Sequence, residues 1–579
     1  MRPGRIHEEF PAPSYRGYQE QALNEIATAF ADGARIVLVR APTGSGKSLL
    51  ARAICGCARR PSEGTPHQVT GAYYTTPQVS QLDAVAEDSL LTDIAIIRGK
   101  RNYSCALPDE PDTPVDRAPC VRDASFDCQI VHRCPYFADR EIAQNKPIAG
   151  MTLAYFMQTA GSGVFGQRDV VVVDEAHGLA DWAEMYATIE LSPRTVPVWG
   201  DLHVPTVTDD PESVLSFAES VVARCKGAQS RIEAKPKLSV SEVARLERLR
   251  DIRRELEWFI SDYSTIDSST TWVTDQRDDD VGAIEIKPLN PARFLHRTVW
   301  DRGSRFALLS ATILDKQSFC HGAGLPPSDV ALIDVPHTFP LDHRPLFDVT
   351  QGKMTQAHRG ETLPAIARTI ARIMAYHPDE KGIIHCHSYA IQRELRSKLT
   401  DFGVESRIIG HDRETRDGSL ADWLHRDDPA VFLSVTMEEA LDLQGDKARW
   451  QVLCKAPFPN IGDPAVAARL EAGDWAWYNR RTLRTVIQAC GRVVRSPDDY
   501  GATYLADSSL LDVFERTRSV MPTWFREQVD QLTTPELPPF DAQQALAGSG
   551  SSSSTSKERE TNRQPSTRGH PLSDVWKSE

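Results

Sequence analysis

A glycine-rich segment near the start of the chain, APTGSGKS at residues 41–48, carries the residue types that bind nucleotide phosphates. Its glycines let backbone N–H groups approach phosphate oxygens closely, Lys47 can reach the β- and γ-phosphates, and the Ser48 hydroxyl can bind Mg²⁺. The strict pattern begins with glycine, whereas this chain has Ala41 there, so the match is partial. An apolar strand before the segment and a helix after it favour a phosphate site over an ordinary Gly/Ser turn. The residues expected to contact a nucleotide are Pro42, Thr43, Gly44, Ser45, Gly46, Lys47 and Ser48.

A pair of acids follows a second apolar run, in DVVVVDEAH at residues 169–177. An acid at the end of a strand is the second half of a nucleotide-hydrolysing site, because it holds Mg²⁺. Asp174 would hold the metal directly or through water, and Glu175 would polarise the attacking water. A lone acid pair after a strand is more often a solvated loop, but the phosphate-binding segment makes the catalytic interpretation the better one.

Two arginines and a glutamine in QACGRVVRS, far along the chain, could bring cations to the γ-phosphate as charge develops there. Gln488 and Arg492 are four residues apart, and Arg492 and Arg495 are three apart, so the three share one face if the segment is helical. Taken in isolation, a surface helix with two solvated arginines is the commoner explanation.

Four cysteines follow one another with the spacing C-x14-C-x7-C-x5-C. Four thiolates suit tetrahedral Zn²⁺ or an iron–sulfur cluster. The spacing matches neither the CxxC pairs of zinc fingers nor the runs of ferredoxins, so it does not choose the metal. The alternative is a set of four unrelated reduced cysteines. The four are Cys105, Cys120, Cys128 and Cys134.

Nearly continuous apolar runs alternate with helical patterns through most of the chain, which is typical of parallel α/β domains whose strands are covered on both faces. Between about residues 181 and 291 such runs thin out, and an amphipathic helix carries one apolar stripe from Val243 to Phe259. From about residue 538, Ser, Thr, Gln, Arg and Gly dominate, which predicts a disordered tail. The expected strands lie at 35–40, 72–76, 94–97, 169–177 and 305–312, and then at 382–388, 406–410, 431–436, 450–457 and 501–507.

The composition bounds the possible classes of protein. Hydrophobic residues make up 41% and charged residues 25% of the 579 residues, which excludes a mostly disordered chain and a disulfide-stapled miniprotein. The net charge of -14 argues against a globally basic nucleic-acid binder, but it allows a local basic groove. No apolar stretch is long enough for a membrane helix and the first residues form no apolar signal, so we expect neither a membrane span nor secretion.

The motifs above, in this order, resemble those of superfamily 2 helicases. The set comprises the phosphate loop, TTPQ (75–78), DEAH (174–177), SAT (310–312) and QACGRVVR (488–495). The upstream YRGYQ is similar to the adenine-reading element of such enzymes, in which Arg16 and Gln19 would contact the base. The resemblance implies that ATP binds between two motor domains, with Gln488, Arg492 and Arg495 reaching in from the second. It also implies that ATP state is coupled to the grip on DNA by His177, Ser310, Thr312 and Asp442.

The cysteine-rich segment is similar to that of the XPD/DinG-type iron–sulfur helicases. RGKRNYSC (98–105) resembles the start of their cluster domain and CPY (134–136) its end, and the helical insertion lies where that family carries its Arch domain. TFPLDHRP (338–345) and APFPNIGDP (456–464) are similar to further segments of the family. The resemblance implies a 4Fe–4S cluster on the four cysteines, 5′→3′ movement on single-stranded DNA, and a cluster domain and Arch that split the duplex.

The chain departs from the family pattern at two places. In EEALDLQG (438–445), Ala440 and Leu443 stand where the family has glycine and phenylalanine. After YLAD (504–507), Ser509 stands where an arginine often follows. We expect these departures to affect the fine coupling of the motor rather than its ATPase core.

We therefore expect an α/β protein with two RecA-like parallel-sheet motor domains, a small iron–sulfur domain, and a mainly helical Arch-like insertion in the first motor domain. The length alone predicts several domains. The expected boundaries are motor domain 1 in three parts (1–103, 137–180 and 292–340), the iron–sulfur domain (104–136), the Arch-like insertion (181–291), motor domain 2 (341–537) and a Ser-rich tail (538–579).

The expected function is that of an ATP-dependent DNA helicase with ATP, Mg²⁺ and a 4Fe–4S cluster as cofactors. It would act as a monomer on single-stranded and forked DNA, without a membrane, and the sequence identifies no protein partner. Two alternatives stay open: a DEAH-type RNA helicase, and a zinc-stapled DNA-binding scaffold that ATP gates without unwinding. We expect a cytoplasmic, nucleoid-associated location in a prokaryotic or viral source and a nuclear one in a eukaryotic source.

Overall fold

The computed structural model describes residues 1–60, 69–122, 126–205, 211–235, 239–265, 272–276, 283–436, 443, 445–540 and 546. They belong to two compact units, one made of Met1–Val335 with Asn460–Trp475 and the other of Pro336–Pro459 with Ala476–Glu579. Each unit is built on its own parallel sheet, as the apolar runs predict. The predicted disordered tail falls almost entirely outside the described residues.

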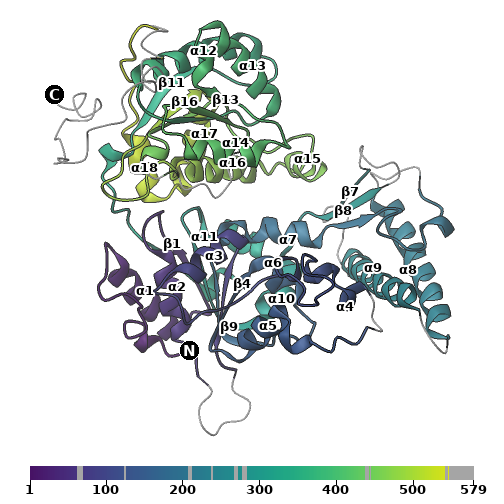
Figure 1. Ribbon diagram of the computed structural model, residues 1–579. Helices are drawn as coiled ribbons and strands as arrows, with labels where there is room; N and C mark the ends of the chain where they lie inside the picture. The colour runs from purple at the N-terminus through teal and green to yellow at the C-terminus, as the bar shows by residue number, and fades with distance from the viewer. Residues whose placement is uncertain are drawn as a thin grey trace. The chain divides into compact units, whose positions relative to one another are not determined.

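The first unit contains a seven-stranded parallel sheet in the order β10-β1-β9-β5-β2-β4-β3 (Figure 1). Every residue of β5 is buried, which explains why its sequence is an apolar run rather than an alternating one. The order places β9 between β1 and β5, so the segments that follow these three strands meet at one edge of the sheet. The strands are β1 (Ile36–Arg40), β2 (Ala72–Thr76), β3 (Ala95–Ile97), β4 (Ile148–Thr152), β5 (Arg168–Val173), β9 (Gly303–Ser310) and β10 (Val330–Asp334).

Helices cover both faces of this sheet, because alternate residues of each strand point to opposite sides. In β1, Ile36 and Leu38 belong to one buried cluster, and Val37 and Val39 belong to the other. The face of the sheet toward which Val37 points is covered by α1 (Gln19–Ala31), α2 (Lys47–Gly56) and α3 (Val79–Glu87). The opposite face, toward which Ile36 points, is covered by α5 (Pro135–Asn145), α6 (Leu153–Gln158), α7 (Leu179–Ala187), α10 (Ala292–Thr298) and α11 (Lys316–Ala323).

The four cysteines lie in the segment between β3 and α5. An isolated bridge pairs Ser104 with Pro114. The Tyr103 hydroxyl ties the segment to α5, because it donates to an Asp139 carboxylate oxygen at 2.9 Å and accepts from the Arg98 N–H at 3.0 Å. Since α5 leads into β4, which pairs with β3, the segment leaves and re-enters the sheet at neighbouring strands. Its short elements are the 3-10 turns Lys100–Asn102, Val115–Arg117 and Val131–Arg133, and α4 (Pro119–Arg122).

The insertion after α7 combines two long helices, α8 (Pro211–Glu233) and α9 (Val240–Thr265), which lie side by side (Figure 1). The predicted stripe is found on α9, where Leu246, Leu249, Ile252, Leu256 and Phe259 are buried. The insertion also holds a small antiparallel sheet in the order β6-β8-β7, which the sequence pattern did not indicate. Its strands are β6 (Ile189–Leu191), β7 (Trp272–Gln276) and β8 (Ile284–Pro288).

Residues 460–475 belong to the first unit although the chain on both sides of them belongs to the second. They contain α15 (Pro464–Glu471), which contacts β7. The Asp463 carboxylate caps α15 by accepting from the Ala465 and Val466 N–H groups, and its second oxygen lies 3.4 Å from the Lys287 ammonium on β8. The sequence did not predict that residues 460–475 return to the first unit.

The second unit contains a six-stranded parallel sheet in the order β11-β16-β15-β12-β14-β13. Both parallel sheets confirm the predicted α/β fold class. No helix in the described part of the chain is long and apolar enough to cross a membrane. The strands are β11 (Leu346–Gly352), β12 (Gly382–His385), β13 (Ile408–Ile409), β14 (Val431–Ser434), β15 (Trp450–Leu453) and β16 (Ala502–Asp507). The helices are α12 (Arg359–Tyr376), α13 (Tyr389–Asp401), α14 (Arg416–His425), α16 (Trp475–Cys490), α17 (Ser509–Thr517) and α18 (Thr523–Asp530).

A glycine in the second sheet makes room for a tryptophan, and this gives a stability prediction. Gly382 on β12 pairs with Trp450 on β15, and a Cβ at Gly382 would overlap the buried indole ring. We expect Gly382→Ala to lower the free energy of unfolding by about 1–3 kcal/mol, as overpacking does in cores. Denaturant unfolding followed by tryptophan fluorescence measures it.

The matched control is Gly360→Ala in α12, where nothing lies within 4 Å of the added Cβ. Alanine is the better helix former, so this variant should keep or slightly raise stability. Equal unfolding midpoints for the two variants would contradict the packing argument.

Candidate nucleotide site and cysteine cavity

The phosphate-binding segment forms a tight loop between β1, which ends at Arg40, and α2, which begins at Lys47. Gly44 and Gly46 have φ values of 79° and 77°, a left-handed conformation that glycine adopts without strain. The Ser45 hydroxyl donates to the Pro42 carbonyl oxygen at 2.7 Å, within the same loop. The loop therefore has the backbone conformation that its glycines predict.

Gln19 holds this loop from α1. Its side-chain amide donates to the Ser45 carbonyl oxygen at 3.0 Å, and its amide oxygen accepts from the Arg16 N–H at 2.9 Å. Gln19 is buried, and a Cβ at Gly46 would overlap its amide group. The pair predicted to contact adenine thus adjoins the loop, while the contact with the base itself stays a prediction.

The two acids stand at the carboxyl end of β5, beside the loop. The Lys47 ammonium lies 3.6 Å from a Glu175 carboxylate oxygen. Glu175 adopts a left-handed backbone with φ 49°, and its N–H donates to an Asp174 carboxylate oxygen at 2.9 Å. A non-glycine residue in this conformation is uncommon and is concentrated at functional turns. The structure thus brings together the lysine and the acids that the sequence proposed.

The two adjacent carboxyl groups have opposite pKa shifts. Burial and the negative charge of Glu175 raise the pKa of Asp174 to about 6, against the opposing effect of Lys47. Burial alone would also raise the pKa of Glu175, but the Lys47 charge and the His177 hydrogen bond outweigh it and lower that pKa. Glu175 therefore keeps its negative charge to a lower pH than Asp174 does, which suits a residue that polarises water.

The SAT segment closes the site from β9. The Ser310 hydroxyl hydrogen-bonds to His177 Nδ1 at 2.7 Å and donates to a Glu175 carboxylate oxygen at 3.3 Å. The Thr312 N–H donates to the Ser310 hydroxyl at 3.1 Å. A continuous hydrogen-bonded path thus joins the acid pair to the residues assigned to coupling.

Arg40, which the sequence analysis did not single out, supports the same edge. Its guanidinium binds both carboxylate oxygens of Asp334 on β10, at 2.9 and 2.5 Å, and donates to the Leu314 carbonyl oxygen at 3.0 Å. It therefore joins the strand before the phosphate loop to the turn after SAT. The signal was present in the sequence, because a charge that ends a buried apolar strand needs a partner.

The second unit carries the remaining predicted residues. Gln488 lies on α16, but this helix ends at Cys490, so Arg492 and Arg495 follow it and do not share a helical face with Gln488. Arg492 is buried, and the Arg495 N–H donates to an Asp499 carboxylate oxygen at 3.1 Å. Asp442 and most of the EEALDLQG segment lie outside the described residues. The action of these residues on a nucleotide bound in the first unit stays a prediction.

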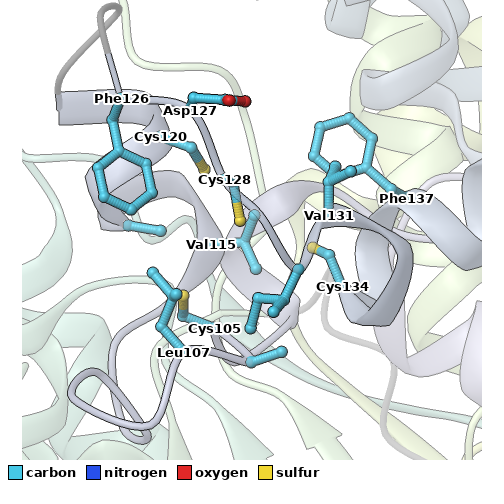
Figure 2. Close-up of a pocket in the computed structure, with 13 residues that line it drawn as sticks. Cys105, Leu107, Val115, Cys120, Phe126, Asp127, Cys128, Val131, Cys134 and Phe137 are labelled. Carbon is cyan, nitrogen blue, oxygen red and sulfur yellow. The ribbon is translucent and has the colours of Figure 1, made fainter.

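The four cysteines of the first unit line one cavity of about 260 Å³. Figure 2 shows their sulfur atoms directed into this space from different parts of the segment. The pKa of Cys120 is raised by burial and by the nearby Cys128, Cys105 and Cys134. All eleven cysteines of the chain are free thiols, so none of the four is used in a disulfide. The other lining residues are apolar except Asp127: Ala106, Leu107, Val115, Ala118, Phe126, Ile130, Val131 and Phe137.

The four thiols line this cavity without forming a complete metal site. Within the described ranges, no three His, Cys, Asp or Glu side chains are close enough to hold a single metal ion. A tetrahedral zinc site needs all four sulfur atoms within about 2.3 Å of one atom. The geometry therefore does not supply a formed mononuclear site.

Comparison with known proteins adds three family matches. A model of the helicase C-terminal domain matches residues 370–528, the DEAD_2 model matches residues 117–196, and a model of the res subunit of type III restriction enzymes matches residues 13–63. They cover the phosphate loop, the DEAH segment and the QACGRVVR segment.

Curated relatives share parts of the chain. Regulator of telomere elongation helicase 1 from Homo sapiens is 30% identical over 17% of this chain and 10% of its own length. The protein from Bos taurus is 28% identical over 29% of this chain and 16% of its own length. The homolog from Drosophila melanogaster is 32% identical over 19% of this chain and 12% of its own length. The matches thus span only a small part of each relative.

Solved structures share the fold over most of the chain. The structure of S. tokodaii Xpd4 has a TM-score of 0.54 at 16% identity and covers 86% of this chain and 97% of its own. A structure of an XPD helicase has a TM-score of 0.53 at 15% identity, over 88% of this chain and 98% of its own. The family matches and the curated relatives support a superfamily 2 helicase of the XPD/DinG type, and the solved structures share its fold.

Proposed function

We propose that this chain is an ATP-dependent DNA helicase that moves 5′→3′ on single-stranded DNA and unwinds duplex. The observation that carries the proposal is the Lys47 ammonium at 3.6 Å from the Glu175 carboxylate, at the edge of a parallel sheet where the phosphate loop, the acids and the SAT segment meet. A cation for the phosphates and an ionised acid for water are the two parts that ATP hydrolysis requires. The curated relatives, which are named as helicases that regulate telomere elongation, support DNA as the nucleic acid.

The residues divide the work of hydrolysis by their chemistry. Lys47 and the N–H groups of the loop bind the β- and γ-phosphates. Ser48 and Asp174 have the oxygen atoms that would hold Mg²⁺, which when bound screens the phosphate charge. Glu175 orients the attacking water and accepts its proton, which the ionised state of its carboxylate allows. Gln488, Arg492 and Arg495 would add cationic and polar groups from the second unit.

The same site would transmit the state of the nucleotide. The Glu175 carboxylate that faces Lys47 is also bound by Ser310, and Ser310 binds His177. Loss of the γ-phosphate changes the charge that Lys47 and Glu175 experience, and the change reaches β9 through these bonds. We propose that this shift accompanies closing and opening of the motor domains.

The cysteine cavity supports an iron–sulfur cluster as the further cofactor. Cys105, Cys120, Cys128 and Cys134 would hold it, and an apolar lining around thiolates suits such a cluster. Four thiolates suit either such a cluster or one Zn²⁺, and the similarity to the iron–sulfur helicases favours the cluster. In this proposal the four cysteines would bind the group and so order the segment between β3 and α5, which would help to separate the strands of forked DNA. The working form would be a monomer.

Strand displacement tests the function as a whole. Duplexes with a 5′ or a 3′ single-stranded overhang, in DNA and in RNA, are incubated with the full chain with and without ATP. We expect displacement of the DNA duplex with a 5′ overhang, and only with ATP. A preference for the 3′ overhang would overturn the polarity, and a preference for RNA would favour an RNA helicase. ATP-dependent binding without displacement would favour a scaffold.

The lysine of the phosphate loop gives the first specific prediction. Lys47→Ala removes the cation that binds the phosphates and leaves Glu175 beside Asp174 without its counter-charge. We expect ATP hydrolysis to be abolished in a steady-state phosphate-release assay. Lys226→Ala is the control, because Lys226 is half exposed on α8 and its loss should leave turnover unchanged. Near-normal turnover by Lys47→Ala would show that the site is elsewhere.

The cysteines give the second prediction. Cys105→Ser should lose iron and unwinding while it retains some ATPase activity, because the nucleotide residues do not contact the cavity. Iron analysis and visible absorbance of anaerobically purified protein measure the first effect. Cys225→Ala, at a buried cysteine of α8, should keep full iron content. Full iron content in Cys105→Ser would refute the ligand assignment, and zinc in place of iron would refute the cluster.

A further inference from the structure

We propose that Tyr74 is a positioning residue for Asp174, one of the expected magnesium ligands of the nucleotide site, so that the chain's affinity for Mg²⁺ depends on its hydroxyl group. The inference rests on the proposed ATP site and adds to it a residue of a neighbouring strand. Tyr74 lies in β2, fully buried, and β2 pairs with β5, the strand that ends at the acids. Nothing in the spacing of the motifs pointed to this residue.

The phenol of Tyr74 touches one of the two expected ligands. Its hydroxyl donates to the Asp174 Oδ2 atom at 3.3 Å. Its strand, β2, packs against α2, the helix that carries Ser48, the other expected ligand. Ser48 and Asp174 come from different elements, α2 and the end of β5, and Tyr74 contacts the Asp174 carboxylate from a third.

The two oxygens of Asp174 are thereby held separately. Oδ1 accepts from the Glu175 N–H at 2.9 Å, and Oδ2 accepts from Tyr74. With both oxygens bound, the carboxylate cannot rotate freely, and its remaining lone pairs keep a fixed direction toward a cation. The 3.3 Å distance is long for a hydrogen bond between two oxygens, so the contact is a weak one.

The neighbouring residue provides a matched control. Tyr73 is also almost completely buried in β2, but it points to the opposite face of the sheet, where its hydroxyl donates to the Gly166 carbonyl oxygen at 2.7 Å. Tyr73→Phe removes the same atom from the same strand and leaves the nucleotide site untouched. Any effect shared by the two variants therefore reports on stability rather than on Mg²⁺.

The test measures binding of a fluorescent ATP analogue to the full chain, with and without MgCl₂. Tyr74→Phe keeps the buried ring, so we expect binding without Mg²⁺ to stay unchanged. In the titration with MgCl₂ we expect the affinity for Mg²⁺ to fall about two-fold to five-fold, the lower part of the usual effect of losing one hydrogen bond. In ATPase assays the variant should need correspondingly more Mg²⁺ and recover its kcat at saturation. Tyr73→Phe should show none of this.

A double-mutant cycle completes the test. Once Asp174→Asn has removed the ligand, adding Tyr74→Phe should cause no further loss of affinity for Mg²⁺. An unchanged affinity in Tyr74→Phe, or an equal loss of binding with and without Mg²⁺, would overturn the inference and leave the ATP site intact. Failure of the unmodified chain to bind the analogue at all would overturn the proposed function, and this inference with it.

Discussion

One lysine beside two half-buried acids sets the arrangement of the nucleotide site in the first unit. Two adjacent carboxyl groups that are partly removed from water repel each other, and a nearby cation favours the ionised form of the one that it faces. Lys47 resolves this conflict in favour of Glu175, whose pKa it lowers, while the pKa of Asp174 stays raised. The chemical difference between two neighbouring acids therefore depends on the placement of a single ammonium group.

The parallel sheet is what places that group. Because β9 lies between β1 and β5, the turns after these strands meet at one edge although they are far apart in sequence. Lys47 follows β1, Ser310 ends β9, and Glu175 follows β5. Side chains from three separate segments thus reach hydrogen-bonding or ion-pair distance without any long loop. Arg40 strengthens the same edge through Asp334 on β10.

The sequence predicted correctly those strands that are buried on both faces of a sheet, because such strands are nearly continuous apolar runs. The strands that precede the acids and SAT follow from that pattern, as does the amphipathic stripe of α9. The sequence analysis missed β4, β10 and β11, the three strands of the small antiparallel sheet (β6, β7 and β8), and the return of residues 460–475 to the first unit, because long-range packing decides these. It grouped Gln488, Arg492 and Arg495 on one face on the condition that the segment is helical, and the helix ends at Cys490, just before Gly491. The cysteines were found as a set, but only the folded segment shows that they surround a cavity.

The cysteine segment enters and leaves the sheet at the neighbouring strands β3 and β4. The pairing of β3 with β4 thus brings the two ends of the segment close together. The hydrogen bond from Tyr103 to Asp139 on α5 links them a second time. The entropy of closing a loop grows only slowly with its length, so a segment inserted here can be lengthened at little thermodynamic expense. This edge is therefore a place where evolution could enlarge or replace an accessory module while the strands that carry Lys47 and Glu175 keep their register.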